Sequence, residues 1–163
     1  MSNVDWLYSR VTSTRKDDLA RRIAMLYGFE TQGGRTSDLV QHPDHSVEPS
    51  RFADWLRRKV FINAQNLLAQ KKWLKEGDHG HTFVISFLPD GTLVEAAAGN
   101  QDCTWKGTWA LTRGVLRLHL GDYISDYLAK SNNRLTGAEE RRLEVGFNAY
   151  FALKPLGARP HKA

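Results

Sequence analysis

The sequence predicts an α+β fold in which N-terminal helices, including one long amphipathic helix, pack on a curved antiparallel β-meander of five to six strands. An apolar stripe with helical spacing runs through about 51–75, and runs of alternating apolar and polar residues follow between 82 and 154. The stripe and the apolar face of the sheet both need cover, so packing one against the other buries both.

The helices are predicted from apolar spacing and from residues that favour helix ends. Helical spacing extends over Asn3 to Val11 and again over Arg15 to Tyr27, after which Gly28 favours a stop. Ser50 is a suitable N-cap for the long helix, and no glycine or proline interrupts 51–75.

Two successive β-hairpins form the centre of the predicted sheet. In the first, an alternating run from Thr82 to Ala96 is interrupted by Pro89-Asp90-Gly91, which favours a tight turn. The second extends from Cys103 to Tyr123 and turns at Thr112-Arg113-Gly114. A further alternating run from Leu143 to Leu153 predicts the last strand.

The pattern is weaker between the second hairpin and the last strand. Ser131-Asn132-Asn133 predicts a turn, and Thr136 to Glu139 has the spacing of a capping box, which predicts one helical turn. Alternatively, the whole of 121–142 is a mobile loop over the sheet.

A short motif in the second hairpin implies an alternative fold. Gly107-Thr108-Trp109 resembles the Gly-x-Trp element of lipocalins, which implies a closed lipocalin-like β-barrel with flanking helices outside it. In lipocalins this element lies near the chain start, on the first strand, whereas here it follows about a hundred residues. Five clear strands are also fewer than the eight of such a barrel, so the meander is the first expectation.

Length and composition are typical of one domain without disulfides. The chain has 163 residues, of which 41% are hydrophobic and 25% charged, ordinary values for a globular protein. We expect a single domain over 1–163, mainly helical over 1–77, with an antiparallel sheet over 82–154 and a flexible tail over 155–163. Cys103 is the only cysteine, which excludes an intrachain disulfide and a Cys-rich zinc site.

Charge and hydropathy limit where the protein is expected to be located and what it is expected to bind. The N-terminus lacks the pattern of a secretory signal and no apolar stretch approaches the ~20 residues that span a bilayer, so we expect a cytoplasmic protein with no membrane contact. The protein is basic, with a net charge of +5 and a pI of about 9.5. The positive excess is spread over several segments and defines no site, so weak nucleic-acid binding is only a third hypothesis.

The apolar side of the sheet offers a candidate ligand site. Trp105 and Trp109 share one strand face, and we expect the small Ala96 beside them on the neighbouring strand. Large side chains next to small ones leave an apolar recess for a small molecule, although the same residues also suit plain core packing.

The polar side offers a candidate catalytic group. Five polar residues converge if the second hairpin pairs with the last strand: Arg117, His119, Glu144, Asn148 and Tyr150. An arginine, a histidine and a glutamate at bonding distance support acid–base chemistry, because histidine titrates near neutral pH. A solvated outer face is the alternative interpretation.

The connection before the first hairpin holds the best local candidate for a metal site. An extended backbone would place the imidazoles of His79 and His81 on one side, next to Asp78. A further ligand from elsewhere would be needed, so a hydrated connector is the alternative, and we expect neither a metal nor another cofactor.

Two hypotheses about function follow. The first is a non-catalytic binding module that recognises a small apolar ligand or a protein partner through the sheet. The alternative is a small cofactor-free enzyme, an isomerase, cyclase or hydrolase, that uses His119, Arg117 and Tyr150. The edges of an open meander can pair between subunits, so a homodimer through a sheet edge is a further expectation.

Overall fold

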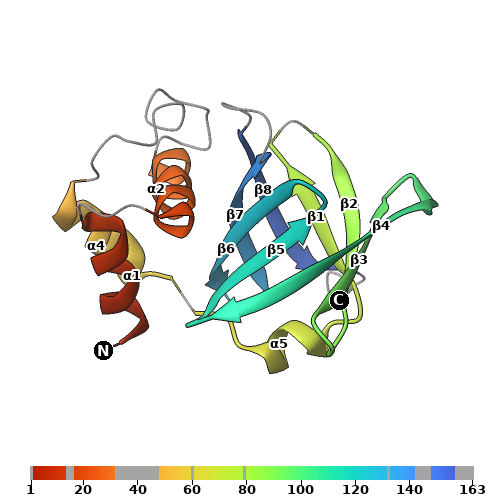
Figure 1. Cartoon of the computed structure of the whole chain (residues 1–163), viewed down its shortest axis with the longest axis horizontal. Helices are drawn as coiled ribbons and strands as arrows, with labels where there is room; N and C mark the ends of the chain where they lie inside the picture. Colours follow the sequence, from red (N-terminus) through yellow and green to blue (C-terminus); the bar gives the residue numbers. More distant parts are fainter. Residues whose placement is uncertain are drawn as a thin grey trace, which may run out of the picture.

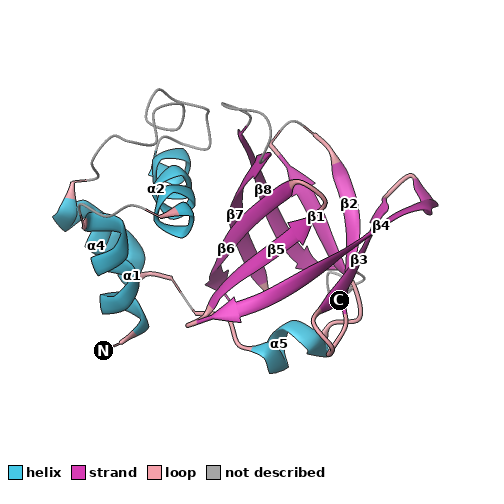
Figure 2. Ribbon diagram, viewed as in Figure 1, coloured by secondary structure: helices cyan, strands magenta, loops and turns pink. Residues whose placement is uncertain are grey.

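The chain forms a closed antiparallel β-barrel with helices packed against its outside (Figures 1 and 2). The architecture comes from a computed structural model that describes residues 2–13, 17–31, 48–59, 61–78, 80–131, 133–141 and 148–156. The helices in these ranges are α1 (Asn3–Thr12), α2 (Asp18–Thr31), α4 (Pro49–Arg57) and α5 (Ala64–Ala69). The strands are β1 (Trp73–Gly77), β2 (Thr82–Phe87), β3 (Thr92–Ala97), β4 (Asn100–Thr112), β5 (Val115–Leu120), β6 (Tyr123–Ser131), β7 (Arg134–Arg141) and β8 (Asn148–Pro155).

Pairing of the first and last strands closes the barrel. Each strand pairs antiparallel with the next one in the chain, and β8 pairs with β1 from Pro155 opposite Trp73 to Phe151 opposite Gly77. The expected meander of five to six strands is therefore wrong, and the alternative, a closed barrel with helices outside it, is confirmed. The pairing of β1 with β8 removes the two outer edges of the expected open sheet. The homodimer through a sheet edge stays a prediction.

Both predicted hairpins are present. β2 and β3 are joined by a turn at Asp90 and Gly91, and β4 and β5 by a turn at Arg113 and Gly114. Arg113 and Gly114 have φ angles of 50° and 83°, the two positive values that a two-residue hairpin turn of type I′ requires. The last predicted strand corresponds to β8, which is described from Asn148 onward.

Three strands, β1, β6 and β7, are not predicted by the sequence pattern. β6 and β7 lack a clear alternation because their inner faces lie in the barrel and their outer faces lie under α2. The turn expected around Ser131 coincides with the connection between these two strands. The helical turn expected over Thr136 to Glu139 is wrong, as is the loop alternative, because this segment belongs to β7.

The long helix expected over about 51–75 is also wrong, because its apolar stripe belongs to two separate cores. α5 is a new helix with Asn63 as its N-cap. Phe52 of α4 packs among the helices, whereas Leu67 of α5 packs in the barrel, and the expected end of the long helix is β1. The two earlier helices are present as α1 and α2, although α2 continues past Gly28.

α5 seals one end of the barrel, the lower end in Figure 1. Ile62 and Leu67 join the barrel core next to Trp73, whose indole Nε1 donates a hydrogen bond to the carbonyl of Leu67 at 3.1 Å. The space that remains beside these residues has a volume of about 10 Å³, which is too small for an organic ligand.

α2 lies against the outer face of β6 and β7 (Figure 1), and a buried ion-pair network holds it there. Arg22 of α2 donates from Nε to Asp126 at 2.6 Å and from Nη1 to Glu140 at 3.0 Å. Arg117 of β5 donates to both carboxylate oxygens of the same Asp126. Because α1 and α4 pack on the outer side with α2, the interior of the barrel is left to the side chains of the strands and of the α5 region.

The structure bears only partly on the remaining expectations. Within the described residues, no helix is long and apolar enough to cross a lipid bilayer. The tail expected over 155–163 lies outside the described residues from 157 onward. The single domain stays a prediction.

Gly137 in β7 is a sensitive position for stability, because an added β-carbon would overlap the ring of its cross-strand partner Tyr127. The Tyr127 side chain is fully buried, so its ring has little room to move. We expect Gly137→Ala to lower the free energy of unfolding by about 1–3 kcal/mol in urea denaturation. The control Gly99→Ala adds a carbon that meets no other atom and should change it by less than ~0.5 kcal/mol. Equal losses in both variants would contradict the expected overlap.

Candidate functional site

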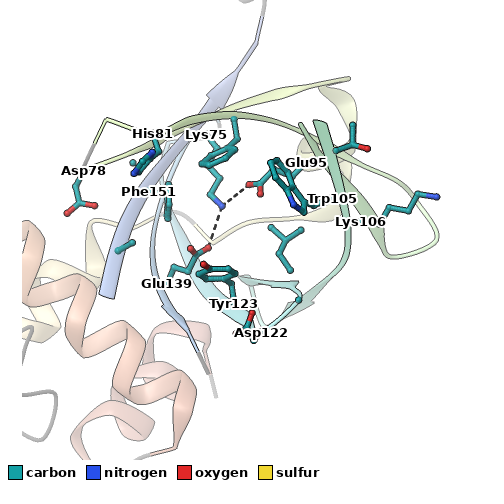
Figure 3. A pocket seen from close by; sticks show the side chains of 16 residues that line it. Lys75, Asp78, His81, Glu95, Trp105, Lys106, Asp122, Tyr123, Glu139 and Phe151 are labelled. Atoms are coloured by element: carbon teal, nitrogen blue, oxygen red, sulfur yellow. Dashed lines mark hydrogen bonds and ion pairs between the residues drawn. The ribbon is translucent and has the colours of Figure 1, made fainter. Parts of the chain in front are cut away.

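The barrel contains a cavity at the end opposite α5 (Figure 3). Its volume is about 790 Å³, within the range of ~300–1,000 Å³ that is usual for small-molecule sites. The β1–β2 connection, the β5–β6 turn and the segment Thr104–Lys106 of β4 surround its mouth. It has both the size and the opening that a ligand requires.

Strand alternation places the cavity lining directly above the sealed core. On β1, Trp73 faces the barrel core and Lys75, two residues later, lines the cavity. On β3, likewise, Leu93 faces the barrel core and Glu95, two residues later, lines the cavity. The inward positions therefore change from purely apolar to mixed aromatic and charged along the barrel axis.

Aromatic rings form the wall of the cavity. Phe83 packs edge-to-face with Phe151 at 6.5 Å between ring centroids, and with Trp105 at 6.2 Å. Tyr123 lies across the cavity near Glu139 (Figure 3). Trp105 stands at the mouth with 49% of its surface exposed, which is unusual for so large an apolar side chain.

Lys75, Glu95 and Glu139 form a buried ionic cluster at the inner end of the cavity (Figure 3). The Nζ of Lys75 donates to Glu95 Oε1 at 2.8 Å and, more weakly, to Glu139 Oε2 at 3.4 Å. The side chains of the three residues are 3%, 9% and 7% exposed. Charges buried to this extent are found in proteins only when they are paired.

The surroundings change the proton affinity of the cluster. Burial alone would lower the pKa of Lys75, but attraction by the surrounding acidic groups, Glu139 and Glu95 among them, raises it above the usual range. Lys75 therefore remains an ammonium near neutral pH and does not provide a free amine nucleophile. Burial raises the pKa of Glu139 more than attraction by Lys75 lowers it, and repulsion from Glu95 adds to the rise.

The residues predicted to bind a ligand are separated by the structure. Trp105 lines the cavity, as described above. Trp109 lies nearer the sealed end, where it packs on Phe87 and its Nε1 donates to the carbonyl of Leu88 at 2.8 Å. Ala96 is on the outer face of β3, because its neighbour Glu95 faces inward.

The predicted catalytic residues are not brought together. β5 pairs with β4 and β6, while β8 pairs with β7 and β1, so the pairing that would join His119 to Tyr150 does not form among the described strands. Arg117 is part of the network that holds α2. Tyr150 is buried under α2, stacked on Phe29 at 3.9 Å between ring centroids. Glu144 lies outside the described residues.

Two of the three predicted metal ligands lie at the mouth of the cavity. Asp78 and His81 belong to its lining, and Asp78 also accepts a hydrogen bond from the N–H of Tyr150 at 3.1 Å. His79 falls outside the described residues. Among the residues that are described, no group of three or more histidine, cysteine, aspartate or glutamate side chains is arranged to hold a metal ion.

Sequence reasoning missed the buried cluster, although a signal was present. Glu95 follows Leu93 by two positions in a predicted strand, so a carboxylate occupies the apolar face. A charge on an apolar strand face requires a partner inside the protein, which marks it as a candidate site residue. Lys75 and Glu139 carried no such signal, because their segments were not predicted as strands.

Comparisons of the chain with models of protein families, with curated proteins and with solved structures found no match. Barrels of this architecture serve many functions, so the fold alone assigns none. The cavity and its chemistry are therefore the basis for a functional conclusion.

Removal of the central cation tests the buried cluster. We expect Lys75→Met to lower the free energy of unfolding by about 3 kcal/mol or more, because two carboxylates would remain buried without a counter-charge. The triple variant Lys75→Met, Glu95→Gln, Glu139→Gln should recover much of the loss in the same urea denaturation. If the single variant is as stable as the wild type, the three groups do not form the pairing described.

The raised pKa of Glu139 predicts a pH dependence of stability. A proton on Glu139 stabilises the folded state, because the folded state binds it more tightly than the unfolded chain does. This stabilisation is complete below the pKa of the unfolded carboxyl, about 4.3. It is lost as the pH rises through the higher pKa of the folded state. Glu139→Gln does not titrate, so we expect its unfolding free energy relative to wild type to increase from about pH 4 to about pH 7. Denaturant unfolding at the two pH values measures the change.

The matched control is Glu76→Gln, which removes a half-exposed carboxylate, paired with Lys154, from the outer face of β1. This variant should keep the pH profile of the wild type. A Glu139→Gln variant that also keeps the wild-type profile would contradict the raised pKa.

Proposed function

We propose that the protein is a non-catalytic binding module that holds a small, largely apolar molecule inside its barrel. The observation that carries this proposal is the cavity of about 790 Å³, lined by aromatic rings, open at one end and sealed by α5 at the other. A concave, mostly apolar space with a few polar groups is the usual form of a small-molecule site. The exposed ring of Trp105 at the mouth offers the first contact for an entering ligand.

The other hypotheses have less support. An enzyme that uses His119, Arg117 and Tyr150 would need these residues in one place, whereas two are on β5 and one is on β8. A partner added along the outer edges of an open sheet has less support, because β1 and β8, which would form those edges, pair with each other. The cavity lining itself holds more carboxylates than ammonium groups, which does not favour a nucleic-acid phosphate as ligand.

Binding of 1-pyrenemethanol, an uncharged aromatic probe, tests the proposal. We expect saturable 1:1 binding, seen as a change in pyrene emission, because the probe is small enough for the cavity and gains apolar contacts there. Trp105→Ala should raise the Kd by roughly two- to tenfold, the effect of losing one aromatic contact of ~0.5–1.5 kcal/mol.

Leu88→Ala is the matched control, because Leu88 is 42% exposed and lies outside the cavity. This variant should bind the probe like the wild type. Absence of saturable binding to the wild type, or equal losses in both variants, would refute binding inside the barrel.

A further inference from the structure

The cavity is acidic although the protein as a whole is basic. Its lining holds the carboxylates of Asp78, Glu95, Asp122 and Glu139, beside two lysines, Lys75 and Lys106, and His81, in a chain with a net charge of +5. Asp122 at the mouth is paired with Arg141 at 3.2 Å, so the excess carboxylates at the inner end are Glu95 and Glu139. Lys106 points away from the cavity, since it follows the inward-facing Trp105 on β4 (Figure 3). Among the described residues, Lys75 is the ammonium that faces the two buried glutamates.

The buried cluster leaves capacity for a second cation. Lys75 contacts one oxygen of each glutamate, Oε1 of Glu95 and Oε2 of Glu139. Among the described residues, no donor is bonded to the other oxygen of either carboxylate, and both side chains are more than nine-tenths buried. When both glutamates are ionised, the cluster carries one excess negative charge inside a space of low dielectric constant, where a counter-charge binds strongly.

The aromatic rings next to the cluster are also suited to binding a cation. The Nζ of Lys75 lies 4.2 Å from the ring centroid of Phe151 and 5.4 Å from that of Phe83. These rings therefore already stabilise an ammonium at this depth, and Tyr123 and Trp105 extend the aromatic wall toward the mouth. Aromatic rings attract organic cations through their negative faces and contact apolar groups equally well.

We propose that the ligand is a protonated organic amine with an apolar, preferably aromatic, body. Its ammonium group donates to the second oxygens of Glu139 and Glu95, and its apolar body lies against Phe83, Phe151 and Trp105. A carboxylate ligand is disfavoured, because it would approach two carboxylates while Lys75 is already paired with both. This inference rests on the proposed binding of a small molecule in the barrel and adds the charge of that molecule.

Three probes that differ in charge at one end test the inference: 1-pyrenemethylamine, 1-pyrenemethanol and 1-pyreneacetate. At neutral pH we expect the wild type to bind the amine at least about tenfold more tightly than the alcohol, as a charge-assisted hydrogen bond of ~1.5–3 kcal/mol implies. The acetate should bind most weakly. Increasing salt should weaken amine binding only modestly, because the ion pair is buried.

Glu139→Gln keeps the size of the side chain and removes its charge. We expect it to reduce the ratio of amine to alcohol affinity by about tenfold. The control Glu76→Gln removes one carboxylate from the outer face of β1 and should leave the ratio unchanged. The wild-type comparison does not depend on the folding of any variant.

The outcomes distinguish the two proposals. If the alcohol binds and the amine binds no more tightly, or if the acetate binds best, the amine inference is refuted while binding in the barrel stands. If none of the three probes binds, the proposed function itself is refuted. An amine preference that survives in Glu139→Gln and Glu95→Gln would also refute the assigned role of the buried carboxylates.

Discussion

The architecture depends on the pairing of β1 with β8. An open sheet with one apolar face would need helices to cover that face, but a closed barrel turns the face inward and covers it with its own strands. The helices are consequently displaced to the outer surface, where the network of Arg22, Asp126 and Glu140 holds α2. The cavity follows from the same closure, because α5 fills only one end of the interior.

The two ends of the barrel differ in chemistry as well as in packing. At the sealed end, Trp73, Leu67 and Ile62 form an apolar core. Toward the mouth, the equivalent inward positions hold the Lys75 cluster, which costs desolvation energy that well-packed apolar residues would avoid. A stability role therefore explains the cluster poorly, since replacing such groups by apolar ones is often neutral or favourable. Recognition of a charged group on a ligand is a role that only polar residues can perform.

Net charge and local charge point to different partners in this protein. The net charge of +5 favours anions at long range. In the buried cluster that the described residues form, however, the two carboxylates of Glu95 and Glu139 face the single ammonium of Lys75. Local charge decides what binds at this depth, because buried groups are screened little by salt and interact strongly at low dielectric constant.

The sequence by itself determined the elements that have turn-forming residues or a clear apolar periodicity. These are the turns at Asp90-Gly91 and Arg113-Gly114, the strands that flank them, and the first helices. The sequence also predicted that Trp105 contacts a ligand, and Trp105 lines the cavity. Only the tertiary structure decided the rest. β6 and β7 are buried on both faces, so their sequences show no alternation of apolar and polar residues. The apolar residues over 51–75 pack in two different cores, and this division is visible only in the folded chain. Lys75, Glu95 and Glu139 are far apart in sequence and meet because barrel closure turns β1, β3 and β7 toward one interior, a long-range constraint that no local pattern encodes.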